Sequence, residues 1–168
     1  MEKIETRQGQ YYLRLDLHVD NETITIVHAK KVIGPVLRLD EIQLAAGILY
    51  EVRKNGRRLD FGAIPYDALF TRFDNLGKDH AQASSLAEIG AYDIHVRIPL
   101  ENFGLNDFEK IEVAIYDLNT VFTNISVSEE PFASQFAEKI EKVAGLTCID
   151  IASLPSDLQK ELQEIIPE

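Results

Sequence analysis

The sequence contains no tryptophan and only one cysteine and one methionine in 168 residues. The lone Cys148 excludes an internal disulfide and any Cys-x-x-Cys metal or redox motif. No apolar run reaches the roughly 20 residues that a membrane-spanning helix needs. Residues 1–5 also lack the basic and apolar regions of a signal peptide, so we expect a cytoplasmic protein that does not contact membranes.

Positive charge is scarce, with 17 Lys and Arg residues against 28 Asp and Glu residues and a net charge of −11. Such a balance repels phosphate backbones and disfavours nucleic-acid binding. The excess is uneven, because residues 129–168 hold nine acidic and three basic side chains. With 45% apolar and 27% charged residues, the composition is otherwise that of an ordinary folded protein.

Much of the chain shows the period-two alternation of half-buried strands, as where Tyr11, Leu13 and Leu15 alternate with polar residues. We expect strands over 11–19, 23–33, 92–98, 111–115 and 121–127. Between residues 36 and 46 the apolar residues change parity. A β-bulge near Asp40, two short strands or a short helix would explain that change.

Asn55-Gly56 is the most specific turn signal, because a type I′ turn requires positive φ at both central residues. A regular register about this turn predicts the pairs Val52 with Leu59, Glu51 with Asp60 and Tyr50 with Phe61. The apolar pairs then share one face of the hairpin, and the charged residues share the other.

The periodicity changes after residue 128. Phe132, Phe136, Ile140 and Val143 have the spacing of one face of an amphipathic helix, which Gly145 would end. We expect this apolar stripe to pack on the sheet, because exposed Phe side chains promote aggregation.

A second helix is expected from about Leu154, with Ser156 as N-cap, Gln159 completing a capping box, and Leu158 and Leu162 on its apolar side. Together these elements predict a mostly β fold. We expect an antiparallel β-sandwich, Ig-like in general shape, over residues 1–128. Two C-terminal α-helices in residues 129–168 would pack on it or flank it.

The predicted hairpin also carries a charge anomaly, a group of four cations: Arg53, Lys54, Arg57 and Arg58. Like charges that face each other across strands are destabilising, so their placement requires an explanation. One interpretation is contact with an anion or an acidic partner, for which arginine is well suited. The other is a solvated tip that prevents edge-to-edge pairing and is partly neutralised by Glu51 and Asp60.

The polar stretch from 74 to 90 contains Asp79, His80 and Ser84, which are residue types of nucleophilic hydrolysis. No Gly-x-Ser-x-Gly motif supports a nucleophile there, and polar loops commonly contain such residues. A hydrolase that uses this loop is therefore an alternative rather than the leading hypothesis.

Metal-ligand spacing is absent from the four histidines, which are His18, His28, His80 and His95. His18 and His95 share the polar parity of Asp16 and Asp93, so we expect exposed strand histidines. Asp and Asn also cluster in turns, without the spacing of an EF-hand. We expect no metal and no cofactor, and keep a Ca²⁺-dependent binding module as an alternative.

The sequence thus favours a non-enzymatic binding or assembly module that acts through protein–protein contacts. Its expected partner is another protein or a second copy of the chain. A second copy is plausible because the basic hairpin and the acidic C-terminal segment are complementary in charge.

Overall fold

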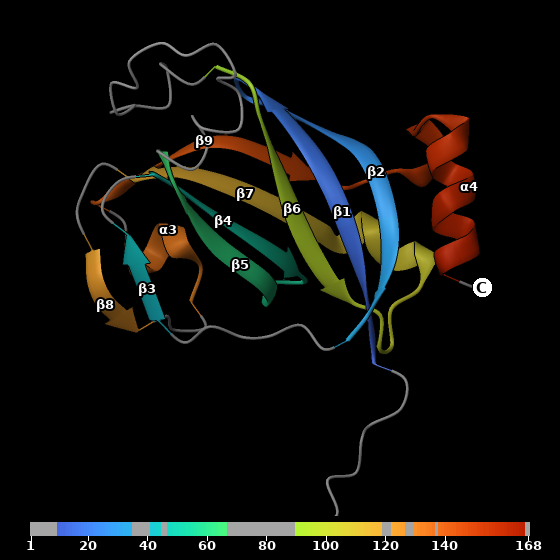
Figure 1. Ribbon diagram of the computed structural model, residues 1–168, viewed down its shortest axis with the longest axis horizontal. Helices are drawn as coiled ribbons and strands as arrows, with labels where there is room; N and C mark the ends of the chain where they lie inside the picture. The colour runs from blue at the N-terminus through green and yellow to red at the C-terminus, as the bar shows by residue number, and fades with distance from the viewer. Residues whose placement is uncertain are drawn as a thin grey trace, which may run out of the picture.

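The computed structural model describes residues 10–34, 41–44, 47–66, 90–118, 122–126, 130–136 and 138–166 (Figure 1). Its elements in chain order are β1 (Tyr11–Asp20), β2 (Thr23–Ile33), β3 (Glu41–Leu44), β4 (Gly47–Lys54), β5 (Arg57–Pro65), β6 (Tyr92–Pro99), the 3₁₀ helix η1 (Leu105–Lys110), β7 (Ile111–Leu118), β8 (Phe122–Ser126), α3 (Phe132–Gln135), β9 (Ile140–Thr147), the 3₁₀ helix η2 (Ile151–Ser153) and α4 (Ser156–Ile165). The five predicted strands correspond to β1, β2, β6, β7 and β8. The ambiguous stretch contains β3, while Asp40, the predicted site of a bulge, lies outside the described residues.

The strands form two main antiparallel sheets and one small sheet. The first has the order β2-β1-β6 and the second the order β5-β4-β7-β9, while β3 pairs with β8. In Figure 1 the three-stranded sheet lies in front of the four-stranded sheet, with α4 beside β2. The fold is therefore mostly β, as predicted.

One hydrophobic core lies between the two main sheets. Alternate residues of β1 and β6 supply much of it: Leu13, Leu15, Leu17, Val19, Tyr92, Ile94, Val96 and Ile98. From the four-stranded sheet, Ile48, Val52 and Val113 are fully buried against them. Burial of one such aliphatic side chain contributes about 1.5–3 kcal/mol, so this layer is the main source of stability.

The predicted turn at Asn55-Gly56 is present, with φ of 50° and 79°, but the predicted register beyond it is wrong. Leu59 forms a β-bulge, so the observed pairs are Val52 with Asp60, Glu51 with Phe61 and Tyr50 with Gly62. Gly62 suits its place because a Cβ there would clash with the side chain of Tyr50. In this register Glu51 and Asp60 no longer face each other, and both side chains are buried.

The predicted helix over residues 132–143 is also wrong. Only Phe132–Gln135 is helical, and residues 140–147 form β9, which pairs with β7. β-branched residues and Gly145 lower the helix propensity there, and hydrogen bonding to β7 outweighs the helical spacing of the apolar residues. Phe132 and Phe136 nevertheless pack on the outer face of the four-stranded sheet, although not as part of the predicted helix. The expected boundary at residues 128 and 129 lies outside the described residues.

The second predicted helix is present as α4, with Leu158 and Leu162 buried. Its N-cap is Pro155 rather than Ser156, and no side chain caps it. The Gln159 amide donates instead to the backbone carbonyls of residues 152 and 154, so the predicted capping box is wrong. None of the helices described here is long and apolar enough to cross a membrane.

Candidate functional site

The four basic hairpin residues occupy different environments. Lys54 forms an ion pair with Asp107 of η1 at 3.2 Å. Arg57 is exposed next to the turn. Arg53 and Arg58 lie on the outer face of the four-stranded sheet, each with only 10% of its side chain exposed. Three of the four cations therefore have a carboxylate partner within the molecule.

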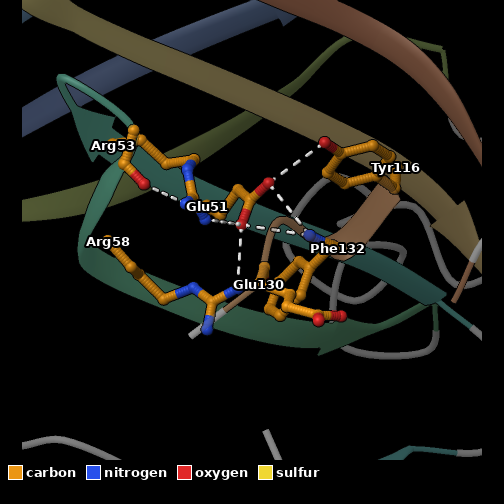
Figure 2. Close-up of polar contacts among 7 residues, drawn as sticks. Glu51, Arg53, Arg58, Tyr116, Glu130 and Phe132 are labelled. Atoms are coloured by element: carbon orange, nitrogen blue, oxygen red, sulfur yellow. Dashed lines mark hydrogen bonds and ion pairs between the residues drawn. The ribbon is translucent and has the colours of Figure 1, made fainter. Parts of the chain in front are cut away.

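Glu51 is the centre of a buried polar cluster on that face (Figure 2). Its side chain lies in the middle of β4, and the residue is only 1% exposed. One carboxylate oxygen lies 3.1 Å from Nη2 of Arg58 and 3.5 Å from Nη1 of Arg53. The other accepts hydrogen bonds from the Tyr116 hydroxyl at 3.1 Å and the Phe132 backbone N–H at 3.2 Å. A buried carboxylate needs such pairing and hydrogen bonding to remain charged.

α3 covers this cluster on the side that faces away from the sheet. The Arg58 guanidinium lies 4.6 Å from the ring centroid of Phe132 and also donates to the backbone carbonyl of Glu130. Burial, together with the charge of Glu51, raises the pKa of the Tyr116 hydroxyl above its ordinary value. The cluster ties β4, β5 and β7 to the segment around α3, so its polar groups hold the fold together.

The three-stranded sheet carries its polar residues on a more open surface. We call this surface the charged face and define it as Arg14, Asp16, His18, His28, Lys30, Asp93, His95 and Arg97. The register places Asp16 opposite His95 and His18 opposite Asp93. In both pairs Nδ1 of the histidine lies 2.7 Å from a carboxylate oxygen, and both histidine side chains are more than 40% exposed. Both histidines therefore lie on the outward face of the sheet, as predicted, but they are half-buried rather than fully exposed.

Asp16 is the most highly connected carboxylate of the charged face. Its Oδ1 accepts a hydrogen bond from Nε of Arg14 at 2.8 Å and lies next to His95 Nδ1. A guanidinium nitrogen of Arg14 also lies 3.3 Å from Nε2 of His95. Partial burial alone would raise the pKa of Asp16, but Arg14 and His95 outweigh it and hold the pKa below its ordinary value. Asp16 is therefore ionised at neutral pH.

Carboxylates from other elements reach both edges of this sheet. On the β6 side, Asp60 accepts the Arg97 backbone N–H at 2.8 Å and pairs with the guanidinium at 3.1 Å. On the β2 side, Glu161 of α4 accepts the Ala29 backbone N–H at 3.2 Å and lies 3.1 Å from Nδ1 of His28. Free backbone groups at a sheet edge invite pairing with another chain. Asp60 and Glu161 each occupy one backbone N–H that would otherwise be free to pair with an added strand.

The predicted catalytic candidates Asp79, His80 and Ser84 lie outside the described residues. Within the parts of the chain that the structure does describe, no three His, Cys, Asp or Glu side chains are grouped so that they could hold a metal ion. Comparisons with family models, curated proteins and solved structures found no match to this chain. Function is therefore inferred from the charged face and its surroundings.

Sequence reasoning missed the burial of Glu51 and the pairing within the charged face. A signal for the first was present, because Ile48, Leu49 and Tyr50 form a continuous apolar run that is typical of a strand buried on both faces. A signal for the second is the pattern Asp-x-His, which occurs at residues 16–18 and again at 93–95. Antiparallel pairing of two such segments places each histidine opposite a carboxylate.

Proposed function

We propose that this protein is a non-enzymatic binding or assembly module, an Ig-like sandwich in general shape, that contacts another protein through the charged face. The exposure of its paired side chains carries this proposal. The side chains of His18 and Asp93 are 42% and 51% exposed although they are bonded to each other. Groups already ordered by such pairing lose less conformational freedom when a partner binds.

Contact through the face of the sheet is favoured over strand addition at its edges. Strand addition needs a row of free backbone donors and acceptors. Asp60 and Glu161 each occupy a backbone N–H at an edge of the three-stranded sheet. An incoming strand would have to displace them, and Asp60 is only 4% exposed.

The basic hairpin supplies a second contact area in this proposal. Arg57 is its exposed member, and Lys54 next to it keeps 24% of its side chain exposed. Arg53 and Arg58 support this area indirectly, through their ion pairs with Glu51.

Site-specific photo-cross-linking in cells tests this proposal. Thr25 is exposed on β2 directly opposite His18, so a photoreactive benzoylphenylalanine at this position samples the charged face. Thr147, exposed on β9, is the matched control on the other sheet. We expect a discrete cross-linked protein from position 25 and not from position 147. Absence of any product at position 25, or an equal yield at both positions, would contradict the proposal.

A further inference from the structure

Three histidines of the charged face are each bonded to a carboxylate. His18 is paired with Asp93, and His28 lies 3.1 Å from Glu161 of α4. His95 is bonded to Asp16, whose same oxygen also binds Arg14. All three histidine side chains are between 41% and 54% exposed, so protons from solvent can reach them.

A row of cations crosses the same face. The register places Lys30 of β2 opposite Arg14 of β1, and Arg14 opposite Arg97 of β6. Like charges directly opposite each other on neighbouring strands are destabilising. The row is tolerated because Asp16 pairs with Arg14, and Asp60 pairs with Arg97.

Protonation of the histidines reverses the formal charge of this face. Three cations stand against five carboxylates on it and at its edges, namely Arg14, Lys30 and Arg97 against Asp16, Asp20, Asp60, Asp93 and Glu161. With neutral histidines the sum is −2, and with all three protonated it is +1. Histidine changes charge between about pH 5 and pH 8. The sign of the face therefore depends on whether these histidines are protonated.

Asp16 shows how the gained charge becomes available. With His95 neutral, its carboxylate pairs with one full cation, Arg14. Once His95 is protonated, the same carboxylate lies between two cations, and one positive charge is left unmatched. An acidic side chain from outside can then pair with it.

We propose that the charged face binds an acidic segment of a partner protein, and that this binding strengthens as the histidines become protonated. This inference rests on the proposed function and adds the chemistry of the partner and its control by protons. Charge complementarity supports an acidic partner, because the face becomes positive on a chain whose net charge is −11. Glutamate side chains of such a partner remain largely ionised at the pH at which histidine gains its proton.

Binding of a short, fluorescein-labelled poly-glutamate peptide, followed by fluorescence anisotropy, tests the inference. We expect the dissociation constant to be at least about tenfold lower near pH 5.5 than near pH 7.5, and added salt to weaken binding. The triple variant H18Q/H28Q/H95Q should lose this pH dependence. The matched control K110Q/K139Q/K142Q removes three positive charges from exposed sites elsewhere and should retain it.

Three outcomes would overturn the inference. They are no binding of the peptide, the same affinity at both pH values, and an equal loss of pH dependence in both triple variants. Sedimentation of the protein alone near pH 5.5 distinguishes a further occupant, because self-association that depends on the histidines would assign the face to a second copy instead.

If the triple histidine variant fails to fold by circular dichroism, the single variant H95Q takes its place and should lose part of the pH dependence. A partner cross-linked from Thr25 that is not acidic leaves the proposed function standing and overturns only this inference.

Discussion

The outer faces of the two main sheets both carry polar residues, but these are buried on one sheet and partly exposed on the other. On the four-stranded sheet, Glu51 is covered by α3 and is 1% exposed. On the three-stranded sheet, the His18 and Asp93 side chains are 42% and 51% exposed. Both carboxylates are paired, so pairing alone does not show whether a polar cluster supports the fold or is available to a partner.

The number of partners separates the two cases. Glu51 contacts two guanidinium groups, one hydroxyl and one backbone N–H, which matches the demand of a buried charge. Among the described residues, Asp93 is paired with His18 alone, and its side chain is 51% exposed. Because Glu51 is buried, its contacts are necessary for folding. Because the Asp93 side chain is partly exposed, its contact with His18 contributes little to stability. Stability and binding should therefore respond to different substitutions.

The largest expected effect comes from opening the covered face. Phe132→Ala removes a fully buried ring that packs on Phe61, Tyr116 and Phe136. We expect the free energy of unfolding in denaturant to fall by about 3–5 kcal/mol. Tyr11→Ala, at an aromatic residue that is 37% exposed, is the control and should cost about 1 kcal/mol or less. Similar losses for both would show that α3 is not an essential cover.

Removal of the buried charge should have the next largest effect. Glu51→Gln keeps the shape of the side chain but leaves Arg53 and Arg58 beside a neutral amide. We expect a loss of about 3 kcal/mol in unfolding free energy. Glu112→Gln on β7 is the matched control, because Glu112 is 48% exposed in its pair with Lys142. A loss below about 1 kcal/mol for the Glu51 variant would place Glu51 among the surface carboxylates.

Asp60 is buried like Glu51 but pairs with Arg97 of the charged face, and it lies where the two main sheets meet. Burial raises its pKa above the ordinary value, outweighing the charge and hydrogen bonds of Arg97. The folded state therefore favours the protonated carboxyl, and the stability that this contributes is lost as pH rises through the folded pKa. Asp60→Asn should cost less than about 2 kcal/mol, and the cost should shrink from about pH 4 to pH 7. A cost that grows with pH would show that the charge of Arg97 outweighs burial.

The smallest effect on stability is expected on the charged face. Asp93→Asn removes one partner of an exposed pair and should change the unfolding free energy by less than about 1 kcal/mol. The same variant should still raise the yield of the cross-link from Thr25, because it removes a carboxylate that would repel the acidic partner. A large loss of stability with an unchanged cross-link would reverse the roles assigned to the two faces.

Strands with one exposed face were predictable from the sequence. β1 and β6 alternate strictly between core and polar residues, because each has the second sheet on one side and a more open surface on the other. The alternation also placed His18 and His95 on the outward face, where both are half-buried. These features follow from local patterns, because the polarity of each residue in an alternating strand matches the face on which it lies.

The errors arose where a residue's position depends on a distant segment. The bulge at Leu59 directs Asp60 toward Arg97, which lies 37 residues away in the chain. β9 forms a strand because β7 offers it hydrogen-bond partners, although its apolar spacing is helical. The setting of Glu51 likewise depends on Phe132, 81 residues later. Local spacing contains none of this information.

The long separations between paired strands also affect how fast the chain folds. His18 and Asp93 are 75 residues apart, and Glu51 and Tyr116 are 65 apart. The β1–β2 and β4–β5 hairpins can form within about 1–10 μs, but joining distant strands requires the closure of long loops. We expect overall folding on the order of milliseconds to seconds, as in other proteins dominated by non-local pairing. Glu51 should keep its hydrating water until α3 arrives, which makes closure of that face a late step.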